Sequence, residues 1–352
     1  MSSDATSPNK AAWLPAAQAN IEVGPAPMPT PAGTEAVIQV HSAALNPADA
    51  VVQKRGLLLQ PENYPFVLGN DIAGIVHAVG PNNTRFKPGD RVTALCRAFA
   101  RKNPAYGGFQ LYSIVDEPML AKIPDHIGFS EASVFGLGLA TAAYSLFNKN
   151  ALALDLPVPG GNAPNGKLLL IWGGASSVGA CGNQAAKAAG YTIAATASAK
   201  NFDLLREMGA EYIFDYNTDS VVEDIVAALK GKGEMAGVFS AIGTPPALAQ
   251  CAAIIGQLEG RKHVATVRPP HFPALENWPE GIEISSNLST SIAENEVGRV
   301  VFGVWLEAAL ADGSMKCRPH CDVVGKGLEG VQGALDIMFK GVSAKKLVVE
   351  IA

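Results

Sequence analysis

The chain has 352 residues, enough for about two domains, and 48% of them are hydrophobic while 17% are charged. This balance supports a large buried core and excludes an intrinsically disordered chain. The net charge of -5 and the lack of any longer basic run argue against nucleic acid as a partner, because phosphate binding needs a basic surface. The apolar stretches are too short or interrupted for a membrane span, and the polar N-terminus lacks a secretory signal pattern, so we expect a cytoplasmic protein.

The cysteines do not form a recognisable metal-ligand pattern. Cys317 and Cys321 enclose His320 in the run CRPHC, which looks like half a metal site. Zinc sites usually need three or four ligands, and no second cluster at ligand spacing accompanies this run. An odd, sparse count of cysteines in a chain of this length also favours reduced thiols inside the cell. We therefore expect no metal site.

Residues 1–130 have the character of short strands separated by turns, which is typical of a β-rich, barrel-like domain. A mostly apolar helix is expected over 130–147, with Ser130 as its N-cap. Residues 151–166 are rich in Pro and Gly and are expected to form an exposed connector. The strands expected in the first part are 35–43, 71–79, 90–94 and 109–115.

From Lys167 onward, short apolar strands alternate with helices. This alternation predicts a parallel, doubly wound α/β sheet. A further helix at about 292–311 and a strand at 346–351 follow, and a strand after a complete α/β unit suggests that the C-terminus rejoins the first domain. The strands expected in the sheet are 168–172, 191–196, 212–214, 237–242, 263–267 and 282–285, and the helices are 178–189, 201–208, 220–229 and 246–255.

The first turn of this sheet, IWGGASSVG at 171–179, is the strongest chemical motif. Glycines let the backbone turn sharply and approach a pyrophosphate, and the next helix points its N–H groups and positive dipole end at the phosphates. The spacing is not a clean G-x-G-x-x-G, and a simple tight turn is the alternative, but the position between a buried strand and a helix favours a dinucleotide site. The residues assigned to the cofactor are Gly174, Ser176, Ser177, Val178 and Gly179.

The end of the second strand indicates which nicotinamide cofactor is used. An NAD enzyme places Asp or Glu there to hold the ribose 2′-hydroxyl. This chain has Ser198, Lys200 and Asn201 instead, a set that suits the 2′-phosphate of NADPH. The alternative is an ordinary helix N-terminus with a solvated lysine.

With these motifs in place, the layout resembles the zinc-free members of the medium-chain dehydrogenase/reductase superfamily over nearly the whole chain. Within that superfamily it is similar to fungal trans-acting enoyl reductases, with 172–178 and 198–204 carrying the narrower match. The other segments that carry the resemblance are LNPAD at 45–49, LGNDIAG at 68–74, KPGDRV at 87–92, EMGAE at 207–211, FDY at 214–216 and KKLVV at 345–349.

The resemblance implies a GroES-like β-rich barrel catalytic domain, residues 1–145 and 290–352, clasping an inserted Rossmann NADPH-binding domain, residues 146–289. It places the active site in the cleft between them. In zinc alcohol dehydrogenases of the superfamily a cysteine stands where this chain has Asn46, and Gly-His-Glu stands where it has Gly69, Asn70 and Asp71. Without those ligands we expect no zinc-dependent alcohol oxidation.

The resemblance also implies roles for individual residues. Thr141 matches an active-site threonine, although a helical threonine bonded to its own backbone is an equal alternative. Tyr216 matches a residue beside the adenosine. Contacts near the nicotinamide and its ribose are implied for Pro47, Ala48, Asp49, Ile242 and Val267.

Hydride transfer to a C=C bond conjugated to a carbonyl is the reaction that these features favour. The expected substrate is a small-molecule or carrier-protein-bound acyl group, with a polyketide synthase as partner. One departure is Val51, where the resembled enzymes have a lysine, and it leaves a redox-neutral role on a bound polyene open. An NADPH:quinone or enone oxidoreductase and a non-reducing binding or partner protein are the other readings.

Overall fold

The structure is a computed structural model that describes residues 8–287 and 289–352. The chain divides into two compact units, one of Met1–Leu137 with His320–Ala352 and one of Gly138–Pro319. In this division residues 290–319 belong to the unit that contains the parallel sheet. The expectation from the sequence that residues 290–352 belong to the first domain stays a prediction. Within the described residues, no helix has both the length and the apolar character needed to cross a bilayer.

The first unit is β-rich, as expected, and its strand pairs are antiparallel except for β15 with β16, which is parallel. Its larger sheet has the order β15-β16-β3-β5-β6-β8, with β7 also paired to β3, and a smaller sheet has the order β2-β1-β4. The bounds in the larger sheet are β3 Ala36–Ala44, β5 Asp71–Val79, β6 Arg91–Leu95, β7 Tyr112–Val115, β8 Leu120–Lys122, β15 Cys321–Lys326 and β16 Lys346–Glu350, and those in the smaller sheet are β1 Lys10–Leu14, β2 Glu22–Pro25 and β4 Phe66–Val67.

The C-terminal strand confirms that the chain returns to its first unit. β16 pairs antiparallel with β3, with Val348 opposite Ala44, and parallel with β15. Helix α11 (Gly330–Phe339) connects β15 to β16 and packs against both strands. Leu347, Val348 and Val349 are buried, so this short strand is part of the core.

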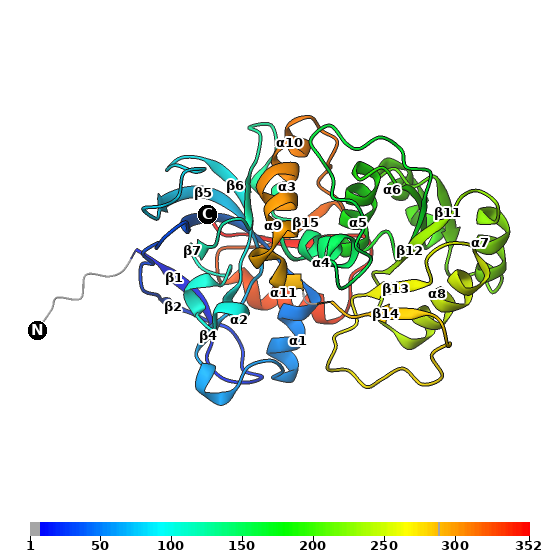
Figure 1. Ribbon diagram of the computed structural model, residues 1–352. Helices are drawn as coiled ribbons and strands as arrows, with labels where there is room; N and C mark the ends of the chain where they lie inside the picture. Colours follow the sequence, from blue (N-terminus) through cyan, green and yellow to red (C-terminus); the bar gives the residue numbers. More distant parts are fainter. Residues whose placement is uncertain (1–7, 288) are drawn as a thin grey trace, which may run out of the picture. The chain divides into compact units, whose positions relative to one another are not determined.

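The second unit contains the predicted doubly wound sheet, with all neighbouring strands parallel in the order β11-β10-β9-β12-β13-β14. Figure 1 shows helices on both sides of it, α5 and α6 on one and α7 and α8 on the other. The bounds are β9 Leu168–Trp172, α5 Ser177–Ala188, β10 Thr192–Ala197, α6 Phe202–Glu207, β11 Tyr212–Asp215, α7 Val221–Leu229, β12 Met235–Ser240, α8 Pro245–Gln257, β13 His263–Thr266 and β14 Glu283–Ser285.

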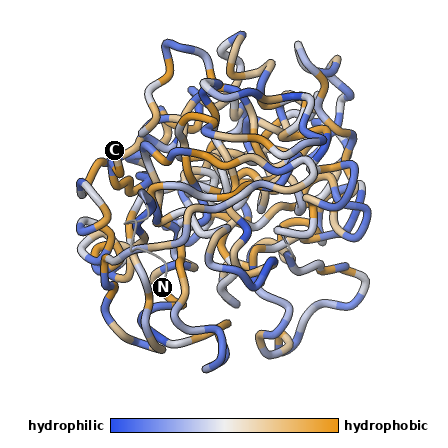
Figure 2. The backbone as a smooth tube through the Cα atoms, turned by 90° about the vertical axis from the view of Figure 1, so that its left-hand side faces the viewer, coloured by the Kyte–Doolittle hydropathy of each residue, from blue (hydrophilic) through white to orange (hydrophobic). Residues whose placement is uncertain are grey.

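Both faces of β9 are covered, which explains why this strand is apolar throughout. Leu168, Leu170 and Trp172 pack with residues of α7 and α8, and the intervening Leu169 and Ile171 are also fully buried. A strand covered on both faces needs apolar side chains at every position. In Figure 2 the hydrophilic stretches lie mainly on outer turns and the apolar ones on inner segments.

The single helix predicted over 130–147 is wrong, because the structure has two: α3 (Phe129–Ala132) and α4 (Gly136–Phe147). Ser130 lies inside α3, and Gly128 is the N-cap, with its N–H donating to Glu131 Oε2 at 3.0 Å. The second helix starts anew because the Asp71 carboxylate accepts the backbone N–H of Leu137. A contact made from a distant strand therefore decides where α4 begins.

The helix predicted at 292–311 is divided as well. A 3-10 segment at Ser289–Glu294 precedes α9 (Glu296–Val300), a π-helical turn at Val301–Trp305 and α10 (Leu306–Ala311). The Asn295 side chain caps α9 by accepting the N–H of Val297 at 2.9 Å.

Candidate functional site

The Gly-rich turn joins β9 to α5 so tightly that side chains are excluded. Gly173 has φ of 81°, and a Cβ added there would lie 2.5 Å from Ile242. A Cβ at Gly179 would lie 2.3 Å from the carbonyl oxygen of Gly173. The first turn of α5 consequently begins in direct contact with the end of the strand, which only glycine at these positions permits.

Side chains from β10 and α5 hold this turn in place. The N–H of Gly173 donates to Thr196 Oγ1 at 3.0 Å, and Asn183 Nδ2 donates to the carbonyl of Gly174 at 3.0 Å. Ser176 is the N-cap of α5: its hydroxyl accepts the N–H of Gly179 at 3.0 Å and donates to the Gly173 carbonyl. Thr196 and Asn183 were not found from the sequence, because neither belongs to a known phosphate motif.

The geometry fits the pyrophosphate of a dinucleotide. N–H groups in the first turn of a helix have no partners within the helix, and the helix dipole makes that end positive. Ser177 and Val178 begin α5 at the carboxyl end of β9 and are partly exposed. Helix N-termini of this kind bind anions through backbone N–H groups. The hydroxyl of Ser176 is used within the turn, so its assigned cofactor contact stays a prediction.

The ends of β10 and β11 bring the residues assigned to the 2′-phosphate together. Ala197 and Asp215 are register partners at the ends of these strands. The hydroxyls of Ser198 and Tyr216 lie 2.9 Å apart, and Lys200 is exposed in the short turn that follows. Asn201 lies at the N-cap of α6. The two hydroxyls are therefore in contact at the carboxyl ends of β10 and β11, and Lys200 follows two residues after Ser198.

Asp215 is a residue of this edge that sequence analysis missed. Its carboxylate accepts the N–H of Ala199 at 3.1 Å and both the N–H and the Nδ2 group of Asn217. Hydrogen bonds from Asn217 and then from Ala199 keep the pKa of Asp215 below its ordinary value, so the group stays charged. Asp215 fixes the turn that carries Ser198 and Lys200.

The residues assigned near the nicotinamide lie just beyond strand ends or on α4. Ile242 follows β12, which ends at Ser240, and Val267 follows β13, which ends at Thr266. Thr141 is 9% exposed on α4, and its carbonyl accepts a hydrogen bond of 2.8 Å from Asn287. The catalytic role of Thr141 stays a prediction.

In the first unit, α1 (Pro47–Arg55) begins with the residues assigned to the nicotinamide ribose. Pro47 is exposed and Ala48 half-buried, but Asp49 is fully buried. The Asp49 carboxylate accepts the N–H of Asn46 at 2.9 Å, the N–H of Gly69 at 3.2 Å and Asn70 Nδ2 at 2.8 Å. Burial raises the pKa of Asp49 to about 6. These bonds give Asp49 a capping role, and its contact with the cofactor stays a prediction.

Val51, which departs from the resembled pattern, is half-buried in the same helix. Lys54, the nearest cation along the helix, is engaged elsewhere, since its Nζ lies 2.5 Å from Asp336 on α11. This ion pair ties α1 to α11 within the first unit.

The positions that match zinc ligands in the superfamily do not fit a zinc ion here. Asn46 and Asn70 supply amides, which are poor zinc ligands. Asp71, the carboxylate next to Asn70, is already paired with the Lys346 ammonium, whose nitrogen lies 2.6 Å from its Oδ2 atom. Across residues 8–287 and 289–352, no cluster of three or more His, Cys, Asp or Glu has the arrangement to hold a metal.

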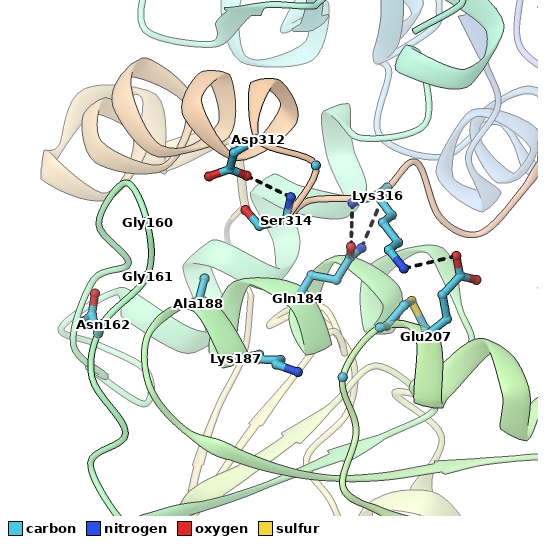
Figure 3. Close-up of a pocket in the computed structure, with 13 residues that line it drawn as sticks. Gly160, Gly161, Asn162, Gln184, Lys187, Ala188, Glu207, Asp312, Ser314 and Lys316 are labelled. Atoms are coloured by element: carbon cyan, nitrogen blue, oxygen red, sulfur yellow. Dashed lines mark hydrogen bonds and ion pairs between the residues drawn. The ribbon is translucent and has the colours of Figure 1, made fainter. Parts of the chain in front are cut away.

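A separate cavity of about 440 Å³ lies in the second unit, at the opposite end of α5 from the Gly-rich turn. Figure 3 shows Gln184 and Lys187 on its wall, with Glu207 and Lys316 beside them. Gln184 accepts the N–H of Lys316 at 2.7 Å, and Glu207 pairs with Arg318. The bonds at this cavity join Lys316 to α5 and join Lys316 and Arg318 to Glu207 of α6.

Comparison with known proteins agrees with this architecture. The family model described as the alcohol dehydrogenase GroES-like domain matches residues 32–125, and the one described as zinc-binding dehydrogenase matches residues 177–267. The chain is 41% identical over 349 residues to the dehydrogenase azaJ of Aspergillus niger, covering 97% of this chain and 98% of that protein. The chain belongs to the medium-chain dehydrogenase/reductase superfamily.

Further members are similar over their full length. The trans-enoyl reductase himH of Aspergillus japonicus is 36% identical, with 98% of each chain covered. The crystal structure of CurK enoyl reductase superposes with a TM-score of 0.76 at 19% identity, covering 98% of this chain and 99% of that one, and this likeness shows the fold alone. Membership makes the protein an oxidoreductase with a GroES-like domain and a Rossmann sheet that takes a nucleotide cofactor.

Proposed function

We propose that the protein is an NADPH-dependent reductase of C=C bonds conjugated to a carbonyl, acting as a trans-enoyl reductase on acyl thioesters of the polyketide type. The observation that carries the cofactor choice is the edge formed by Ser198, Lys200 and Tyr216. Hydroxyls and a cation bind a phosphate monoester, whereas a ribose diol is held by an acceptor carboxylate.

The position of the nearby carboxylate supports the same choice. In an NAD enzyme the acid ends the second strand of the sheet. Here β10 ends at Ala197, and Asp215 belongs to the next strand, where Ala199 and Asn217 donate to its oxygens. A carboxylate with three donors already in place is a weak acceptor for a ribose hydroxyl.

The reaction divides between the cofactor and the residues of this chain. NADPH, when bound, supplies a hydride for the β-carbon of the acceptor. The chain must then stabilise charge on the carbonyl oxygen of the substrate, which calls for a preorganised donor. The Thr141 hydroxyl is the donor that we assign, because α4 is buried along its length and begins at a fixed point set by Asp71.

The relatives support an acyl substrate carried by another protein. Several of them are named trans-enoyl reductases, at 31–36% identity. We therefore propose a carrier-protein-bound acyl chain as substrate and a polyketide synthase as partner. An alcohol substrate is disfavoured, because the Asn46, Asn70 and Asp71 set does not fit the zinc that polarises it.

The proposal is tested by titrating the protein with NADPH and NADH and then screening oxidation of the bound cofactor. We expect tighter binding of NADPH and turnover with enoyl thioesters such as crotonyl-N-acetylcysteamine. Turnover restricted to quinones or simple enones would replace the substrate assignment by a quinone or enone reductase. Tight NADPH binding with no turnover on any of these acceptors would favour a non-reducing partner protein.

A further inference from the structure

A buried lysine forms the centre of a polar cluster in the first unit. Lys346 lies on β16, and its side chain is 2% exposed. Lysine is almost never fully buried unless its charge is paired. The ammonium nitrogen lies 2.6 Å from Asp71 Oδ2 and 2.7 Å from Asn46 Oδ1, and Asp71 is itself fully buried.

The two partners of Lys346 connect it to the starts of two helices. Asn46 is the N-cap residue of α1, and its Nδ2 group donates to Asp71 Oδ2 at 3.0 Å. The other oxygen of Asp71 accepts the N–H of Leu137 in the first turn of α4. A Cβ at Gly136 would lie 2.2 Å from that oxygen, so α4 begins directly against the carboxylate. One ion pair thus ties β16, α1 and α4 together.

The cation of this cluster belongs to the chain itself. Asn46 stands where zinc members of the superfamily have a cysteine ligand, Asp71 stands where they have the Glu of Gly-His-Glu, and both face the Lys346 ammonium. A second cation at this place would be repelled at short distance in a medium of low dielectric. We propose that the Lys346 ammonium neutralises Asp71 and positions the starts of α1 and α4, at a place where the residues do not fit a metal ion.

This role makes Lys346 a positioning residue rather than a catalytic one. Helix α4 carries Thr141, and the start of α1 carries Pro47 and Ala48. Loss of the ammonium leaves a buried carboxylate without its counter-charge, so the carboxylate moves toward other donors or toward solvent and shifts the start of α4. The effect on turnover rests on the proposed reductase function, whereas the effect on metal binding does not.

The first test measures metal directly. The protein is incubated with zinc chloride, desalted, and analysed for zinc by mass spectrometry, beside the Asp71→Asn variant. We expect well below one zinc per chain in both proteins, or zinc that is equal in both and therefore bound elsewhere. One zinc per wild-type chain that the Asp71→Asn variant loses would overturn the proposal. This result is independent of any reductase activity.

The second test compares Lys346→Met with Lys345→Met, a neighbouring lysine whose side chain is 58% exposed and pairs with Asp322 at the surface. For Lys346→Met we expect kcat to fall about 10- to 100-fold, as for a misplaced active-site group, with the Kd for NADPH within about threefold of wild type. For Lys345→Met we expect both constants to be unchanged. Equal kcat in the two variants would refute the positioning role.

A third variant keeps the comparison open if Lys346→Met does not fold. The double variant Asp71→Asn with Lys346→Met removes both charges together, and its amide oxygen can still accept the N–H of Leu137. A double variant that folds where Lys346→Met does not shows that the ammonium serves to neutralise Asp71, and this result supports the proposal. A double variant whose Tm is as low as that of Lys346→Met would overturn it.

Discussion

Gly179→Ala is a sharp test of the Gly-rich turn as a dinucleotide site. The new Cβ would lie 2.3 Å from the Gly173 carbonyl oxygen and 2.8 Å from Gly174 Cα, and both are backbone atoms that cannot rotate away. Ordinary contacts begin near 3.4 Å, so the first turn of α5 must retreat from β9 by about 1 Å. A displacement of that size costs up to about 100-fold where groups must be aligned.

We therefore expect Gly179→Ala to weaken NADPH and NADH binding by a similar factor, of about 10- to 100-fold, because both cofactors share the pyrophosphate. Overpacking should also lower the free energy of unfolding by about 1–3 kcal/mol. The higher helix propensity of Ala over Gly offsets about 1 kcal/mol of this loss. Gly333→Ala is the matched control, since nothing lies within 4 Å of its Cβ in α11. Fluorescence titration and thermal unfolding measure both effects. Wild-type affinity for both cofactors in Gly179→Ala would refute the reasoning.

Three other variants test separate parts of the account. Lys200→Ala should weaken NADPH binding about 5- to 10-fold, as expected for one exposed charge-assisted hydrogen bond, and leave NADH nearly unchanged; an equal loss for both in the same titration would remove the phosphate assignment. Thr141→Val should lower kcat about 10- to 100-fold with little change in the Kd for NADPH or in Tm, because it removes one donor to the developing charge; steady-state kinetics with unchanged kcat would return Thr141 to a structural role. Glu207→Gln should lower Tm at neutral pH, where the hydrogen bond from Arg318 holds the Glu207 pKa below its ordinary 4.5. A carboxylate with a lowered pKa stabilises the fold above 4.5 and loses that effect as the group is protonated, so the difference in Tm should narrow at lower pH, and a constant difference would contradict the ion pair.

The parallel sheet could be predicted from the sequence because its strands are apolar throughout and its helices alternate with them. The Leu168–Trp172 strand and the turn after it are local patterns, and their positions in the structure agree with the expectation to within a residue. The terminal strand was predictable for the same reason, since Leu347, Val348 and Val349 form an apolar run near the end of the chain.

Features set by distant contacts could not be predicted in this way. The break between α3 and α4 depends on Asp71, 66 residues before Leu137. Lys346 is the second lysine of a KK pair and looks like a surface residue, yet its partner Asn46 is 300 residues away. Asp49 was assigned to the cofactor because its position matches the family, whereas its buried bonds to Gly69 and Asn70 show a local role in capping.

The most direct test of the proposed reaction is transfer of label from cofactor to substrate. The protein is mixed with NADPH that carries deuterium at both positions of C4 of the nicotinamide and with crotonyl-N-acetylcysteamine, and the product is analysed by mass spectrometry and NMR. We predict a saturated thioester with deuterium on the β-carbon, formed with NADPH far faster than with NADH. Unchanged crotonyl thioester beside unoxidised NADPH, in protein that binds NADPH tightly, would contradict the assignment of this chain as an enoyl reductase.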